Sequence, residues 1–257
     1  MNGKKIETIL EKLFPINLAY DWDNVGLQIG SLNKDVNTIL LSLDITDEVC
    51  NEAIEKGSEL IIVHHPLIFS PLKSIKTDSN IGKIIQKLIQ NDIALYVMHT
   101  NFDAKENGLN KILADMINLK NTNVLSFTTE TEGIGLYSDI DSTPVSDLIT
   151  LVKTVFKLER ARYIGDLDAI VKRVAITGGS GSSGIKDCLK NNVDLYITGD
   201  ISYHHALDSL AHGLNIIDVG HNIEKYAING LLEILKGSDI TSELILSKVN
   251  TDPYKFV

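Results

Sequence analysis

Short apolar runs alternate with amphipathic segments along most of this chain, and this alternation restricts the fold more than any other feature. The apolar runs at 38–44, 60–63 and 93–98 have the length of buried strands. The segments between them, 46–56 and 79–91, repeat apolar residues at helical spacing. Because strands and helices alternate, we expect an α/β fold with a parallel sheet covered by helices.

The second half of the chain begins differently and then returns to the same alternation. Short strands are expected at 124–128, 135–137 and 160–165, around a helix at 144–157. A strand–helix–strand unit follows over 174–198. The remaining expected elements are a helix at 202–212, a strand at 214–219, a helix at 223–235 and a strand at 243–249.

The two strand–helix–strand units align without a gap. A shift of 135 positions pairs Ile39 with Val174 and Leu60 with Leu195. This self-similarity predicts an internal duplication, that is, two similar α/β domains facing each other across a cleft. The expected domains are 1–123 plus about 222–257, and 124–221.

Charge and cysteine content exclude several classes of protein. The formal net charge of −10 argues against nucleic-acid or anionic-membrane partners, which require a basic surface. Cys50 and Cys188 lie in predicted helices without a CxxC motif, as expected of buried thiols in a reducing compartment. No signal peptide and no apolar run of membrane-spanning length are apparent, so we expect a cytoplasmic protein.

Two adjacent histidines, His64 and His65, follow the strand at 60–63, and Pro66 ends that strand. Ligands in open α/β sheets gather at the carboxyl ends of strands. Neighbouring strand residues point to opposite faces, so both rings reach one site only if the backbone has left the strand. The alternative is one buried, hydrogen-bonded histidine beside one exposed histidine.

Two more polar clusters lie at expected strand ends or helix starts. His99 and Asp103 follow the strand at 93–98, and His221 with Glu224 opens a helix, where residues three apart share a face. Imidazole nitrogens with carboxylate oxygens suit zinc, manganese or iron. Three of these imidazoles with the two carboxylates exceed the needs of one tetrahedral ion, and they fit a two-metal site that activates water. The alternatives are a helix cap for Asp103 and an ion pair for His221 with Glu224.

Four further side chains could hold ligating imidazoles or metal-bound water through hydrogen bonds, or could instead serve as caps and turns. They are His99, Asp23, Asp44 and Asp200. Asp23 belongs to 19–31, which is predicted to be a loop around the single tryptophan.

Gly179, Gly181 and Gly184 form a GxGxxG pattern between a strand and a helix, and Asp200 follows as in dinucleotide-binding proteins. The serine-rich stretch would equally hold the phosphate of any nucleotide on its backbone amides, although the lysine of a P-loop is missing. A plain flexible turn is the third alternative. The phosphate-binding candidates are Gly179, Ser180 and Gly181.

Several longer motifs carry a family resemblance: WDNVGLQIG, VHHPLIF, HTNFDAKENGLN, ITGGSG, TGD and DVGHNIEKYA, in this order. Together they resemble the Nif-three-like family of dinuclear metal-centre proteins, also named GTP cyclohydrolase I type 2 homologues. The resemblance implies two similar α/β domains, a toroidal homohexamer, and two divalent ions (zinc, iron or manganese) in the cleft between the domains. The ligands it implies are His64, His65, Asp103, His221 and Glu224.

The chain departs from the family pattern at one point, because the last histidine and glutamate of some members are four residues apart and here they are three apart. It also lacks the inserted domain that some relatives carry. Two functions are expected from these features. The first is a metal-dependent hydrolase acting on GTP, another nucleotide or a phosphate ester, with no catalytic residue identified beyond the ligands. The second is a non-catalytic regulatory or storage hexamer that binds metal and nucleotide.

Overall fold

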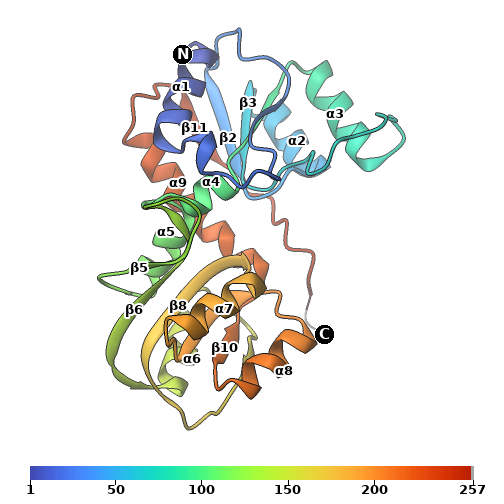
Figure 1. Cartoon of the computed structure of the whole chain (residues 1–257). Helices are drawn as coiled ribbons and strands as arrows, with labels where there is room; N and C mark the ends of the chain where they lie inside the picture. Colours follow the sequence, from blue (N-terminus) through green and yellow to red (C-terminus); the bar gives the residue numbers. More distant parts are fainter. Residues whose placement is uncertain (256–257) are drawn as a thin grey trace. The chain divides into compact units, whose positions relative to one another are not determined.

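The computed structural model describes residues 1–255 and divides the chain into two compact units (Figure 1). Unit 1 comprises Met1–Phe102 and Ile228–Val257, and unit 2 comprises Asp103–Ala227. The chain passes from one unit to the other within α4 (Thr100–Ala104) and again within α9 (Lys225–Lys236).

Unit 1 contains a five-stranded sheet in the order β1-β4-β3-β2-β11. The four strands from β11 to β4 are parallel, and β1 pairs antiparallel with β4 at one edge. Every residue of β2, β3 and β4 is buried, as expected of central parallel strands covered on both faces. The strands are β1 (Gly26–Ile29), β2 (Thr38–Ser42), β3 (Leu60–Val63), β4 (Ala94–Val97) and β11 (Glu243–Leu246).

Two helices of unit 1 begin at residues whose hydroxyl groups cap them. Thr46 accepts a hydrogen bond from Val49 N at the start of α2, and Ser79 accepts one from Gly82 N at the start of α3. The helices are α1 (Gly3–Leu13), η1 (Ile16–Leu18), α2 (Asp47–Glu55) and α3 (Asn80–Gln90).

Unit 2 contains a six-stranded sheet in the order β5-β6-β8-β9-β10-β7. Strands β8, β9 and β10 are parallel, while β5, β6 and β7 add antiparallel pairs. The strands are β5 (Asn123–Phe127), β6 (Gly133–Pro144), β7 (Arg162–Ile164), β8 (Ile170–Ser180), β9 (Leu195–Gly199) and β10 (Asn215–Asp218). The helices are α5 (Leu109–Met116), α6 (Val145–Val155), η2 (Ser182–Gly184), α7 (Ile185–Lys190), α8 (Tyr203–Ala211) and η3 (His221–Glu224).

The parallel strands pair in equivalent registers in the two sheets. Ile39 of β2 pairs with Leu60 of β3, and Val174 of β8 pairs with Leu195 of β9. A third parallel strand and an antiparallel edge strand then follow in both sheets, β4 with β1 and β10 with β7. The sequence alignment at a shift of 135 positions therefore corresponds to the same strand pairing in each unit.

Two differences from the sequence prediction concern segments that contain candidate site residues. The expected loop at 19–31 contains β1, whose residues pair antiparallel with those of β4. The strand expected at 174–177 extends from Ile170 to Ser180 as β8. The first part of the glycine-rich segment is therefore strand rather than turn.

Both cysteines are free and buried, as predicted. Burial raises the pKa of the Cys50 thiol to about 12, and it also raises the pKa of Cys188, so both remain protonated near neutral pH. Within residues 1–255, none of the helices combines the length and apolar character needed to cross a membrane.

Candidate metal-binding site

Three imidazoles of unit 1 lie together at the carboxyl ends of β3 and β4. The N–H groups of His64 and His65 both donate to Leu43 O, at 3.2 and 3.0 Å, so the backbone turns immediately after β3. The two ring centroids are 4.9 Å apart, and the His99 ring lies 5.1 Å from His64 and 5.9 Å from His65. One ring nitrogen from each residue lies within 4.8 Å of the others. We call these three residues the imidazole cluster, and its geometry meets the condition that both adjacent histidines reach one site.

Each imidazole of this cluster is oriented through its Nδ1 atom. The Nδ1 distances are 2.8 Å from His64 to Met98 O, 2.7 Å from His65 to Asp44 Oδ1, and 2.9 Å from His99 to both oxygens of Asp23. A carbonyl or carboxylate oxygen only accepts, so Nδ1 carries the proton in each pair. In a neutral ring, Nε2 then presents the lone pair that a metal ion binds.

The Asp23 carboxylate that holds His99 is enclosed, with a side chain 0% exposed. It also accepts hydrogen bonds from the Thr100 backbone N–H at 3.1 Å and from the Thr100 hydroxyl. Burial favours the neutral acid, but the hydrogen bonds from His99 and Thr100 outweigh burial and lower the pKa of Asp23 to about 2. Asp23 is therefore ionised near neutral pH and fixes the His99 proton on Nδ1.

Asp44 holds His65 in a similar way. Its second carboxylate oxygen, Oδ2, accepts a hydrogen bond from the hydroxyl of Thr251, a residue beyond β11. Thr100 and Thr251 thus support the two aspartates that orient imidazoles of unit 1, and sequence reasoning did not identify either threonine. A hydroxyl residue carries no sequence signal for such a contact, since its partner lies far away in the chain.

A second cluster lies in unit 2, within η3. A 3₁₀-helix has three residues per turn, so His221 and Glu224 lie on one face. Their Nε2 and Oε2 atoms are 3.2 Å apart, and the Glu224 side chain is only 4% exposed. Nδ1 of His221 lies 2.8 Å from Asp200 Oδ2, which repeats the orientation found in unit 1. Asp103, in α4, presents a carboxylate oxygen within 4.8 Å of one of Glu224.

Gly179 provides the space that Glu224 occupies. Its φ of +60° lies in the left-handed region, and a Cβ atom added there would lie 2.5 Å from Glu224 Oε1 and 3.3 Å from His221 Nε2. A Cβ on Gly181 would lie 2.0 Å from the Thr198 hydroxyl. Close packing therefore accounts for these two glycines, and phosphate binding by Gly179, Ser180 and Gly181 stays a prediction.

Two buried polar residues that sequence reasoning missed support this second cluster. Asn110 accepts a hydrogen bond from Gly178 N at 3.0 Å and donates one to Asp103 O at 3.0 Å. Asp218, at the end of β10, accepts hydrogen bonds from Gly220 N and Ile201 N, both at 3.0 Å. The position of Asp218 at a strand end, two residues before the glycine that precedes His221, is the signal that could have identified it.

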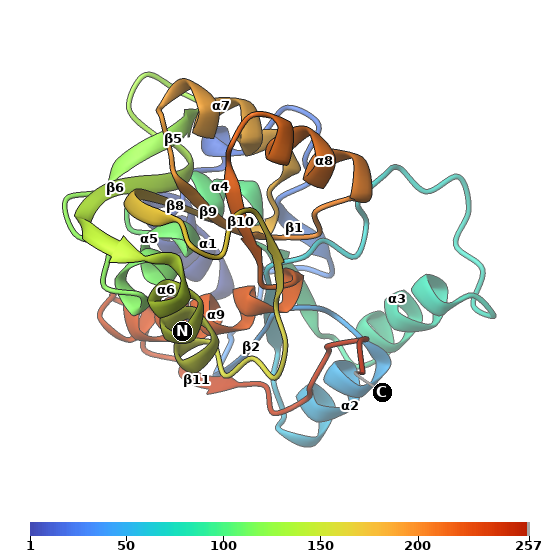
Figure 2. The same cartoon turned by 90° about the horizontal axis from the view of Figure 1, so that it is seen from below.

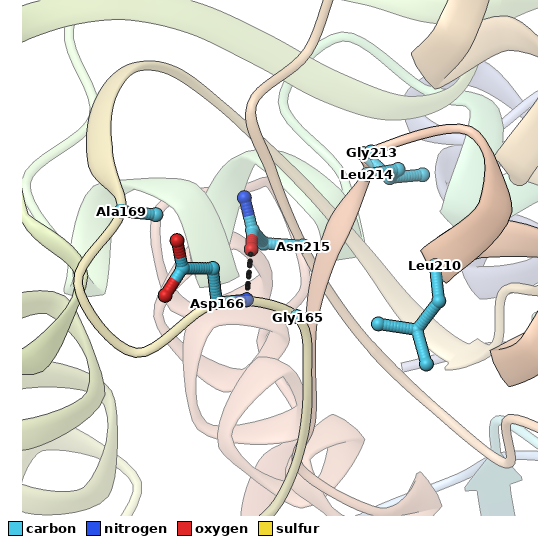
Figure 3. Close-up of a pocket in the computed structure, with 7 residues that line it drawn as sticks. All are labelled: Gly165, Asp166, Ala169, Leu210, Gly213, Leu214 and Asn215. Atoms are coloured by element: carbon cyan, nitrogen blue, oxygen red, sulfur yellow. Dashed lines mark hydrogen bonds between the residues drawn. The ribbon is translucent and has the colours of Figure 1, made fainter.

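A pocket of about 460 Å³ also lies in unit 2, and Figure 3 shows the residues that line it. Asp166 is the one titratable residue of its lining, and its backbone N–H donates to Asn215 at 3.0 Å. None of the predicted site residues lines this pocket, so it is separate from the candidate metal-binding clusters.

The fold and these two clusters define an α/β protein whose imidazole and carboxylate groups could bind a metal. The chain belongs to the Duf34/NIF3 (NGG1p interacting factor 3) family, whose model matches residues 1–253. This result confirms the family resemblance inferred from the sequence motifs.

Individual relatives agree with this assignment. A Clostridium perfringens protein named GTP cyclohydrolase 1 type 2 homolog is 39% identical over 262 residues, covering 100% of both chains. A Listeria innocua protein of the same name is 32% identical in an alignment of 368 positions, covering 99% of each chain. The crystal structure of a Bacillus cereus protein related to NIF3 has a TM-score of 0.95 at 31% identity, covering 100% of this chain and 99% of that one.

Proposed function

We propose that the protein is a metal-dependent hydrolase with a dinuclear centre of divalent zinc, iron or manganese ions. The proposed ligands are His64 and His65 from unit 1 and Asp103, His221 and Glu224 from unit 2. The observation that carries this proposal is the shared orientation of the imidazoles, each of which uses Nδ1 for an oxygen partner. Metal-ligating histidines characteristically donate their second nitrogen in this way.

The donor set fits such ions. It contains no thiolate, and its imidazoles and carboxylates match the preferences of zinc, iron and manganese. Two carboxylates, Asp103 and Glu224, would offset part of the positive charge of two divalent ions. Glu224 is nearly enclosed beside Gly179, which suits a carboxylate held in a fixed orientation.

His99 has the same orientation as the proposed ligands, and we propose that it borders the centre rather than completing it. When bound, divalent ions supply Lewis acidity and a source of nucleophilic water near neutral pH. The chain's own contribution is positioning, because Asp44, Asp23 and Asp200 each keep a proton on an Nδ1 atom and so fix a ring. The proposed substrates are GTP, another nucleotide or a phosphate ester.

The test compares metal content and hydrolysis in the wild type and two ligand variants. We expect His65→Ala and Glu224→Gln to reduce bound metal, measured by elemental analysis, and to abolish hydrolysis of GTP and model phosphate esters. His212→Ala is the matched control. Nδ1 of His212 also contacts a carbonyl oxygen, Asp208 O at 2.7 Å, but this histidine is exposed at the end of α8. Equal metal content in all four proteins would refute the ligand assignment.

One observation favours a second function, the non-catalytic metal- and nucleotide-binding hexamer. The aspartates near the imidazoles, Asp23, Asp44 and Asp200, are each engaged in orienting a ring, which leaves them poorly suited to transfer protons. The same experiment separates the functions, since metal and nucleotide binding without turnover in the wild type would favour the second. Sedimentation velocity would test the proposed hexameric ring in both cases.

A further inference from the structure

We infer that Tyr20, Trp22 and Phe69 of unit 1 form a stacking surface for a flat heteroaromatic ring of the nucleobase type, beside the imidazole cluster. We call these three residues the aromatic platform. Their exposed fractions are 37%, 56% and 54%, which is high for large aromatic side chains. The rings of Tyr20 and Trp22 are stacked with centroids 5.5 Å apart, and those of Trp22 and Phe69 are also 5.5 Å apart, tilted by 47°.

The platform is continuous with the imidazole cluster. The Trp22 centroid lies 6.2 Å from that of His99, in an edge-to-face arrangement. Asp23, the next residue, holds His99 through both carboxylate oxygens. One short segment therefore places an exposed indole and orients an imidazole, so a small molecule stacked on Trp22 would extend towards the cluster.

Hydrogen bonds fix both segments that carry the platform. Tyr20 N donates to the Thr100 hydroxyl at 3.1 Å, and Asp23 N donates to Tyr20 O at 2.9 Å. Phe69 lies in the loop between β3 and α3, drawn in teal in Figure 2.

The loop carrying Phe69 is tied to the segment around β1 by side-chain amides. Asn24 donates to Ile68 O at 2.6 Å, while Gln28 accepts from Ile68 N at 2.9 Å. A surface held in this way binds a ligand without a large ordering cost.

The chemistry of the platform selects a planar ring rather than a phosphate. Every nucleobase has a π-face, and stacking on an aromatic side chain contributes to binding whichever base is present. The protein carries a formal net charge of −10, so phosphate groups gain nothing from its overall field. The inference rests on the proposed function only in taking the stacked ring to be part of the molecule that the metal centre acts on.

The test uses Trp22 itself, because it is the only tryptophan of the sequence. Metal-free protein is titrated with adenosine or guanosine, and with ribose 5-phosphate as the matched probe without a ring system. We expect saturable quenching of Trp22 fluorescence by both nucleosides and none by ribose 5-phosphate. Equal quenching by ribose 5-phosphate, or no quenching by the nucleosides, would overturn the inference.

Variants separate stacking from general loss of structure. Phe69→Leu should weaken adenosine binding roughly tenfold, as expected for the loss of one stacking contact. Trp22→Leu, followed by equilibrium dialysis with labelled adenosine, should weaken binding at least as much. Phe127→Leu removes another exposed aromatic ring, 64% exposed on β5 of unit 2, and should leave binding unchanged. Equal affinity in all these variants contradicts the platform.

The readout is independent of the metal proposal. Nucleoside binding by the metal-free protein, together with normal metal content in His65→Ala, would refute the proposed centre and leave the platform standing. Loss of metal in His65→Ala, together with no nucleoside binding by the metal-free protein, would refute the platform alone. Trp22 fluorescence could instead change with protein concentration but not with nucleoside. This result would show that copies of the chain contact each other at the platform, and it would overturn the inference.

Discussion

The hydroxyl of Thr251 donates a hydrogen bond to one carboxylate oxygen of Asp44, whose other oxygen lies 2.7 Å from Nδ1 of His65. A residue beyond β11 thereby helps to orient an imidazole at the end of β3. Removing an outer partner of a metal-ligating histidine commonly costs 10–100-fold in metal affinity. The threonine acts one step further away, through Asp44, so its effect should be smaller.

We therefore expect Thr251→Val to weaken metal binding by roughly threefold to tenfold in a chelator competition assay. The Asp44 side chain is 32% exposed and can bind water instead, so the free energy of unfolding should fall by less than about 1 kcal/mol. Thr154→Val is the control, because it removes a hydroxyl hydrogen bond, to Thr150 O, at an exposed position of α6. Equal metal affinity in the two variants would show that Thr251 has no positioning role.

Asp23 should make a pH-dependent contribution to stability. Its pKa is lowered from 3.8 to about 2 in the folded protein, so the contribution is complete above about pH 4 and is lost as the pH falls through 2. After allowance for solvent screening, we expect Asp23→Asn to lower the free energy of unfolding by about 1–2 kcal/mol at neutral pH. Denaturant unfolding of both proteins should show this difference shrinking towards pH 2, whereas a constant difference would contradict the role of the Asp23 charge.

Gly179→Ala should impair metal binding because the new methyl group would lie 2.5 Å from Glu224 Oε1 and displace that carboxylate. Gly213→Ala is a matched control, since Gly213 also has a positive φ, +75°, but has nothing within 4 Å of the added Cβ. Both variants should lose about 1–2 kcal/mol of stability from backbone strain. Only Gly179→Ala should also lose bound metal, and elemental analysis of both proteins checks this expectation.

Asp218→Asn should destabilise the protein by about 2–3 kcal/mol, because the buried NH₂ group of the new side chain would face other hydrogen-bond donors. One carboxylate oxygen accepts from Gly220 N and the other from Ile201 N and Arg162, so either orientation of the amide places its NH₂ group against an N–H. Chemical denaturation measures the loss. Asp141→Asn, at an exposed position, should change stability by less than about 0.5 kcal/mol, and an equal loss in both would contradict the argument.

Local sequence signals predicted most of the elements around the candidate site. The apolar run at 60–63 coincides with β3, and the capping residues Thr46 and Ser79 mark the starts of α2 and α3. The histidines at strand ends were also visible, since chemistry at the carboxyl ends of strands follows from the topology. These features depend on residues that are close together in the chain.

Features that depend on distant partners could not be predicted in the same way. Asp23 was a candidate partner for some imidazole, but its contact with His99 spans 76 positions and requires the turn after β4. β1 has only four residues, and its pairing with β4, which lies far away in the chain, defines it as a strand. The glycine-rich segment matched a phosphate-binding pattern, yet Gly179 is required at least by the space that Glu224 occupies. A glycine pattern alone does not show which atom approaches the backbone.

The discontinuity of unit 1 sets an order of events during synthesis. All of Asp103–Ala227 is made before β11, which pairs with β2 and completes the sheet of unit 1. Thr251 follows later still, 207 positions after Asp44. Unit 2 can therefore fold on the ribosome while unit 1 still lacks an edge strand. The surroundings of His65 are among the last parts of the protein to form. A ribosome that stalls after unit 2 would leave Asp44, which orients this imidazole, without the hydrogen bond from Thr251.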